Sequence, residues 1–193
     1  MKKLKRIFSA LLIGAMALTL LVGCGGGSTF SSVQYIGEGT TILENSIKNS
    51  DSWTGGDTSI SIIDNEALRS LTETWAKEAS LALPQLCDPQ LTDYADKYLR
   101  LPFEVRCGDL LIKEGIIGEG DHMDISVQVL NADNYTRDEL NVELATWLKD
   151  NQGYIQDNQT PKNAALHVYS AINPLDETQK AWVVFMVVTG PKK

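Results

Sequence analysis

The segment from Ala181 to Val188 constrains the fold of this 193-residue chain more than any other. It is apolar throughout, rich in valine, and contains Trp182 and Phe185. β-Branched and aromatic residues favour strands, and a strand without apolar–polar alternation is usually covered on both faces. The sequence therefore predicts a central sheet with helices on each side.

The segments before this strand predict its neighbours in the sheet. Residues 165–172 alternate weakly, and the connection Asn173–Lys180 has the length of a hairpin loop, so the two strands should pair antiparallel. Residues 123–129 alternate apolar and polar side chains, as a half-buried strand does. Short strands are also expected at Val33–Ile36 and Leu110–Ile112.

Apolar residues at helical spacing predict two helices in the first half of the globular region. The first follows Asp64 as its N-cap and ends before Pro84. The second begins at Asp88-Pro89 and stops at Pro102.

A third predicted helix opens with a capping box formed by Thr136 and Glu139, and Gly153 suits its end. The expected order is therefore helix, helix, strand, helix, strand, strand. This order predicts an α/β fold, a three-layer α/β/α sandwich with a mainly antiparallel central sheet.

The N-terminal segment begins with basic residues and continues with an apolar run, 7–22, that is short for a membrane span. Leu21-Val22-Gly23-Cys24 then resembles the lipobox of bacterial lipoprotein precursors. The resemblance implies that residues 1–23 are a signal peptide and that Cys24 carries lipid on the extracytoplasmic face of a cell membrane. The alternative is an ordinary secretory signal followed by a chance cysteine.

Residues 24–58 are rich in small and polar residues, which predicts a lipid-anchored flexible tether. Trp53 is expected to pack back onto the globular domain, which we place at residues 59–193. Without residues 1–23 the chain has 13 basic and 25 acidic residues, a net charge near −12. So acidic a chain is not expected to bind nucleic acid; its predicted partner is membrane lipid, through the acylated Cys24.

Two further cysteines, Cys87 and Cys107, remain. Outside the cytoplasm a disulfide can persist, and this pair would close a loop of roughly 20 residues, worth about 3 kcal/mol in the chain-entropy model. Two buried free thiols are the alternative. Neither cysteine has a second metal ligand at close spacing, and no cofactor is predicted.

Three stretches between residues 62 and 190 resemble the CAP superfamily of SCP-like extracellular domains. They are Leu71–Arg100, Glu143–Tyr154 and His167–Val188, which are similar to the family's first two helices, its glutamate and tryptophan run, and its closing hairpin. The resemblance implies a cleft, in which bacterial members often carry two histidines and two glutamates that bind a divalent cation.

The candidate cleft of this chain contains Glu119, His122, Glu143 and Tyr154. Glu119 and Glu143 match the two glutamates, whereas Tyr154 stands in place of the second histidine. The segment 103–107, where the first histidine belongs, has none. Because zinc prefers nitrogen and sulfur ligands, no metal site is expected.

We therefore expect a membrane-anchored lipoprotein whose CAP-like domain binds a peptide, a glycan or a lipid without catalysis. The expected cleft lies between the strand at Met123 and the helix at Leu140. One alternative is a cell-wall or peptide hydrolase that uses Glu119, Glu143 and His122. Another is an accessory or scaffold lipoprotein without a small ligand, which an exposed apolar patch or a stable oligomer would indicate.

Overall fold

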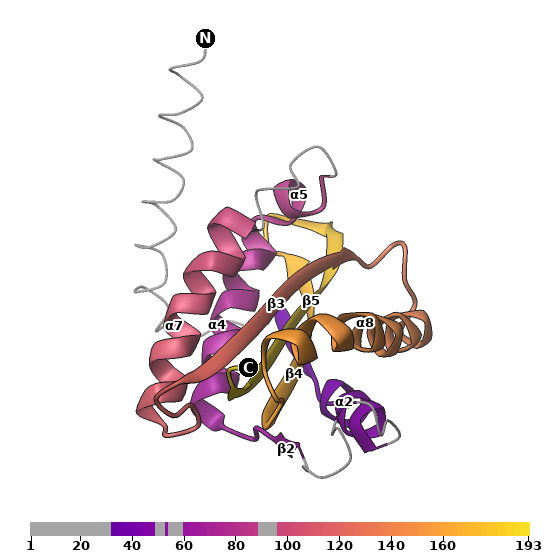
Figure 1. Cartoon of the computed structure of the whole chain (residues 1–193). Helices are drawn as coiled ribbons and strands as arrows, with labels where there is room; N and C mark the ends of the chain where they lie inside the picture. The colour runs from indigo at the N-terminus through magenta and orange to yellow at the C-terminus, as the bar shows by residue number, and fades with distance from the viewer. Residues whose placement is uncertain (1–31, 49–52, 54–59, 89–95) are drawn as a thin grey trace. The chain divides into compact units, whose positions relative to one another are not determined.

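The computed structural model describes residues 32–48, 53, 60–88 and 96–193. They form a mixed α/β domain with a five-stranded, mainly antiparallel sheet (Figure 1). The predicted signal peptide and Cys24 lie outside the described residues.

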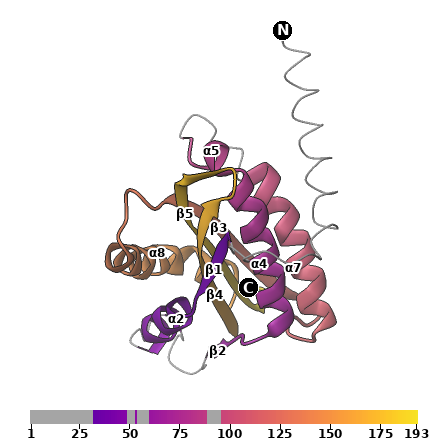
Figure 2. The ribbon, with the colours of Figure 1, turned by 180° about the vertical axis from the view of Figure 1, so that it is seen from behind.

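The sheet has two edge strands of very different length. Its order is β1 (Val33–Ile36), β4 (Asn163–Asn173), β5 (Asp176–Pro191) and β3 (Asp121–Asn131), and the two-residue β2 (Ser61–Ile62) pairs with the start of β4. Figure 1 is seen from the β3 side and Figure 2 from the β1 side. The predicted antiparallel hairpin of β4 and β5 is confirmed.

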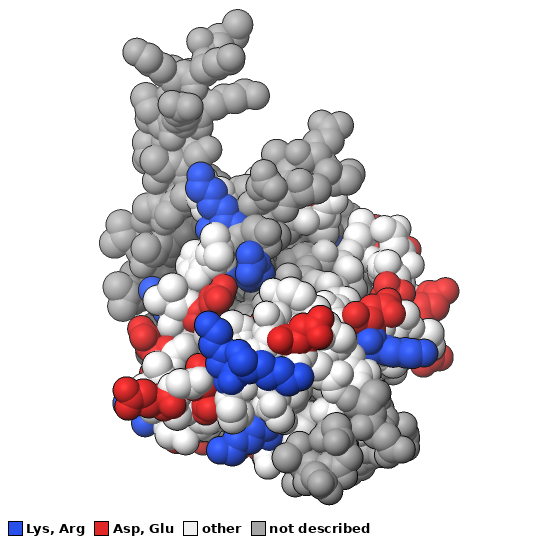
Figure 3. Space-filling view, in the orientation of Figure 1, with Lys and Arg blue, Asp and Glu red and all other residues white. Residues whose placement is uncertain are grey.

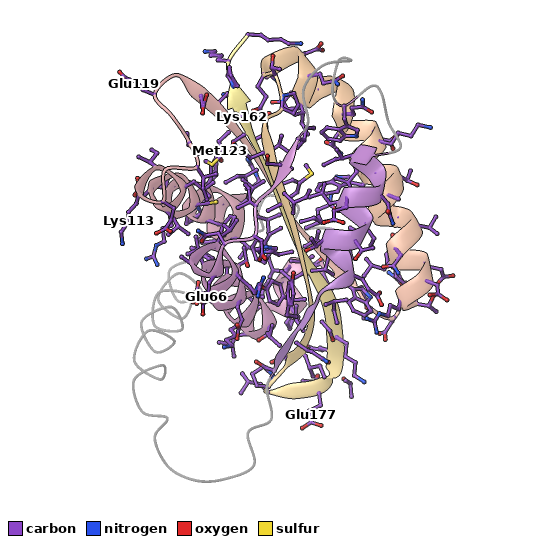
Figure 4. All side chains as sticks on the ribbon, turned by 90° about the horizontal axis from the view of Figure 1, so that it is seen from below. Glu66, Lys113, Glu119, Met123, Lys162 and Glu177 are labelled. Atoms are coloured by element: carbon purple, nitrogen blue, oxygen red, sulfur yellow. The ribbon has the colours of Figure 1, made fainter. Side chains whose placement is uncertain are left out.

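Helices pack against both faces of the sheet, which Figure 4 shows edge-on. α4 (Glu66–Leu81) and α7 (Leu101–Lys113) contact the face that carries Tyr169 and Phe185. α2 (Glu38–Lys48) and α8 (Arg137–Asn158) cover the face that carries Leu166 and Val184. Alternate residues of β5 thus enter two separate cores, which explains why this strand is apolar throughout.

The domain begins earlier than the predicted boundary at residue 59. β1 is present as expected, but α2 follows it, and Leu43 and Ile47 of this helix are buried against the sheet. The predicted tether over 24–58 is therefore wrong for residues 32–48. The prediction for Trp53 is confirmed, since this side chain is 2% exposed and belongs to the same core.

The segment after Pro102 is a helix, not the predicted helix end and short strand. Pro102 occupies the first turn of α7, where its missing N–H costs no hydrogen bond. Leu110–Ile112 completes this helix, and Phe103, Cys107 and Leu111 form its buried side at a spacing of four residues. A short helix α5 (Leu83–Leu86) and a π-helical turn η1 (Asp96–Arg100) precede α7, and the predicted helix start at residue 89 lies outside the described residues.

Two other helix ends test the sequence signals. The N-cap of α4 is Asn65 rather than Asp64, because the Leu68 N–H donates to Asn65 Oδ1 over 2.9 Å. The capping box of Thr136 and Glu139 is confirmed at the start of α8. That helix does not end near Gly153, however, but continues to Asn158.

Candidate binding surface

The side chains of Met123 and Leu140, which mark the strand and the helix of the expected cleft, lie on opposite faces of the sheet, and the cleft itself stays a prediction. Met123 packs against the core under α4 and α7, beside Gly108 of α7. Leu140 belongs to the core under α8. Figure 4 shows Met123 on the α7 side, with Glu119 at the outer end of the loop before β3.

The four predicted cleft residues do not all lie together, because Glu143 is far along α8 from the other three. His122 lies on β3, just after the exposed Glu119, and the C-terminal end of α8 is held to the same strand by Gln159. Glu143 precedes Gln159 by 16 residues, which is about 24 Å of helix at 1.5 Å per residue. Tyr154 is nearer that end, but its side chain is 66% exposed.

A small polar cluster fastens α8 to β3. Gln159 Nε2 donates to Asp124 Oδ2 over 2.7 Å, and His122 Nε2 lies 3.4 Å from Asp124 Oδ1. Gln159 is fully buried, and its Oε1 has no hydrogen-bond partner. Within the described part of the chain, no three His, Cys, Asp or Glu side chains are placed to hold a metal ion. The cluster therefore holds two elements together.

His167 is a buried, hydrogen-bonded histidine of β4. Its Nδ1 lies 2.9 Å from Thr72 Oγ1, and Thr72 Oγ1 lies 2.7 Å from the Tyr169 hydroxyl. Burial, with the nearby positive charge of Arg69, lowers the pKa of His167 to about 4. Burial also raises the pKa of Tyr169 to about 12. Both groups are thus neutral near pH 7, and the network ties α4 to β4.

The predicted bridge between Cys87 and Cys107 is not formed. Both are free thiols, one at the end of α5 and one on the buried side of α7. Burial, with the nearby Glu104, raises the pKa of Cys107 to about 12, which disfavours the reactive thiolate. The structure therefore contains the alternative, two free thiols.

The central part of the outer edge of β3, from Met123 to Val129, has no backbone partner among the described residues, whereas the Asp121 N–H donates to Gly118 O and the Asn131 carbonyl accepts from the Asn134 N–H. The Ala132 N–H donates to Lys180 O, and the Lys192 N–H donates to Gly120 O, so even-numbered residues direct their backbone groups toward β5. Odd-numbered residues must direct theirs away from it. Among the described residues, no strand or backbone group pairs with this edge at positions 123, 125, 127 and 129.

An exposed apolar stripe on α7 lies beside this edge. Leu101, Val105 and Ile112 are 49%, 66% and 63% exposed. Leu101 and Val105 lie seven and three residues before Gly108, and Ile112 lies four residues after it. Residues at these spacings share one side of a helix, so all three lie on the side of Gly108. A Cβ at Gly108 would lie 3.2 Å from Met123 Cε on β3. We call the β3 edge and these three side chains the edge surface.

Charge does not dominate the face of the molecule on the β3 side. Figure 3 shows basic and acidic side chains there in small, mixed groups rather than in one patch of a single sign.

Sequence reasoning missed this surface for two reasons. The alternation of β3 was visible, but its position at the edge depends on the strand order. The apolar spacing of Leu101, Val105 and Ile112 is also visible in the sequence. Pro102 and Leu110–Ile112, however, predict a helix end and a short strand in place of the single helix α7.

No helix among the described residues has the length and apolar character needed to cross a membrane. We also compared the chain with protein families, curated proteins and solved structures. No family, curated protein or solved structure gives a significant match.

Proposed function

We propose that this protein is a lipid-anchored, extracytoplasmic accessory protein that binds extended polypeptide at the edge surface, without catalysis. The observation that carries the proposal is the edge of β3 from Met123 to Val129, which no described backbone group pairs with, beside the apolar stripe of α7. An open edge recognises a polypeptide through main-chain hydrogen bonds, and neighbouring apolar groups add affinity and selectivity. Of the ligands expected from sequence, peptide fits this surface better than glycan or lipid.

The lipid anchor would keep this surface near the membrane. Cys24 is eight residues before Ser32, the first described residue of the domain. A fully extended chain of that length spans at most about 28 Å. Two acyl chains on Cys24 would hold the chain stably, whereas one binds a bilayer only marginally. The polypeptides within reach are then those at the same membrane surface.

We also propose that the domain is a three-layer α/β/α sandwich, a description supported by the separate cores on the two faces of the sheet. The relation to the CAP superfamily stays a prediction. Of the four cleft residues only His122 belongs to β3, and its backbone groups face β5 rather than the outer edge.

The hydrolase alternative loses support from the separation of Glu119 and Glu143. Glu143 lies about 24 Å along α8 from Gln159, which is held to β3 near Glu119, whereas two-carboxylate hydrolysis needs separations below about 10 Å. If hydrolysis of peptide or cell-wall glycan is observed, the double variant Glu119→Gln with Glu143→Gln separates the two functions. The binding proposal predicts that the double substitution leaves both the hydrolysis and the binding of polypeptide unchanged.

Metabolic labelling with an alkyne fatty acid tests the anchor. The full chain, expressed in a bacterium that processes lipoproteins, should become labelled and partition with membranes, whereas Cys24→Ser should do neither. An unlabelled wild-type chain, or one that retains residues 1–23, would contradict the anchor and leave the edge surface unaffected.

A titration with a defined peptide tests the binding. We choose eight alternating valine and threonine residues with a lysine at each end, because such a peptide pairs through its backbone without carrying a particular recognition sequence. In a full chain diluted until it is monomeric, the peptide should slow amide exchange at Met123, Ile125, Val127 and Val129. Equal exchange with and without millimolar peptide would contradict the proposal.

A further inference from the structure

We propose that the polypeptide bound at the edge surface is a second copy of this chain, paired antiparallel through β3 about a two-fold axis at Ser126. The inference rests on the proposed function and names the partner of the same surface. It follows from three properties of β3 and α7.

The first property is that β3 is complementary to itself. A two-fold axis at Ser126 places Asp121 opposite Asn131 of the other copy and Asp124 opposite Gln128. No like charges then face each other, whereas a parallel pairing would align Asp124 with its own copy. The odd residues, whose backbone groups point outward, also fall opposite odd residues, as hydrogen-bonded pairs require.

The second property is that the second half of β3 lacks the charge, proline and bulge that protect many edges from pairing. The segment Ile125–Leu130 contains no charged residue and no proline. The β3–β5 register runs without a shift from Asp121 to Asn131, so no bulge bends the edge away. Natural edge strands usually carry at least one of these features, and a long edge without them is a template for another strand.

The third property is the position of α7. A two-fold axis perpendicular to the sheet puts both copies of α7 on the same face, next to the new strand pair. The stripes of Leu101, Val105 and Ile112 then meet across the axis. A second copy therefore occupies the strand edge and covers the exposed stripe at once, whereas an unrelated strand would satisfy only the first.

A cysteine placed on the axis tests this geometry in the membrane-anchored full chain. Ser126 would face its own copy in a non-hydrogen-bonded pair, with Cα atoms about 4.5 Å apart, which lies within the range of a disulfide. Ser126→Cys should therefore give a disulfide-linked dimer on a non-reducing gel. Gln128→Cys is the matched control and should not, because the proposed register places it opposite Asp124.

Substitutions on the edge surface test whether the dimer depends on it. Val129→Pro removes an outward N–H, and Val105→Lys puts like charges on the side of α7 that faces the axis. Each should lower the amount of disulfide-linked Ser126→Cys dimer at least fivefold.

Two control variants should leave the amount of this dimer unchanged. Val129→Ala keeps the N–H, and Val142→Lys adds the same charge at a side chain of α8 that is 68% exposed.

Absence of the Ser126→Cys dimer, or equal effects of Val105→Lys and Val142→Lys, would overturn the proposal. A chain whose edge amides slow with the valine–threonine peptide, but which gives no cross-link, would bind polypeptide without pairing with itself. A chain that fails both experiments would lack the proposed function as well.

Discussion

His167 is the buried residue whose charge state should matter most for stability. It is 4% exposed, and its nearest polar partner is the hydroxyl of Thr72 rather than a carboxylate. The fold therefore accommodates the neutral imidazole and disfavours the imidazolium.

The free energy of unfolding should fall as the pH drops through the range 6.5 to 4. The pKa of His167 is about 4 in the fold and about 6.5 in the unfolded chain, so the unfolded chain binds more protons in this window. At pH 5 the loss attributable to this group is about 2 kcal/mol relative to pH 7. Urea unfolding of wild type and His167→Gln at both pH values isolates it. Equal losses in both proteins would contradict the assignment.

The two thiols should be distinguishable by reactivity. In the folded Cys24→Ser chain, the half-buried Cys87 should react slowly with a thiol reagent and the buried Cys107 hardly at all, because burial raises both pKa values. After denaturation without reductant, both should react. Finding no free thiol in the denatured chain would restore the disulfide predicted from sequence.

At the scale of the element, two glycines should respond oppositely to alanine. Gly153 lies inside α8 with open space around its missing Cβ, so Gly153→Ala should stabilise the domain by about 0.5–1 kcal/mol. A Cβ on Gly190 of β5 would overlap the carbonyl of Thr160, so Gly190→Ala should destabilise it by about 1–3 kcal/mol. Thermal unfolding of both variants measures this, and effects of the same sign would mean that one of these elements is placed wrongly.

Elements with strong local signals were predictable, and those that depend on tertiary contacts were not. The apolar run of β5 and the capping box of Thr136 each admit one main interpretation, and both are confirmed. Pro102 is compatible with either end of a helix, and only burial of Phe103 and Cys107 selects the start. α2 was missed because its few apolar residues lie in a polar stretch and are stabilised by packing on β4.

At the scale of the whole molecule, the candidate site required the strand order. The expected cleft lies between the strand at Met123 and the helix at Leu140, and the structure places these two side chains on opposite faces of the sheet. The open edge exists because β5 takes β4 as one neighbour and β3 as the other, so that β3 ends the sheet. No local pattern in residues 121–131 distinguishes an edge strand from a central one with one polar face.

Amide hydrogen exchange of the full chain, diluted until it is monomeric and without added peptide, measures the openness of β3 most directly. Met123, Ile125, Val127 and Val129 should exchange fast, while Asp124, Ser126 and Gln128, bonded to β5, should exchange slowly. Uniformly slow exchange along the strand would mean that another part of the chain covers the edge, and would contradict the binding surface proposed for this protein.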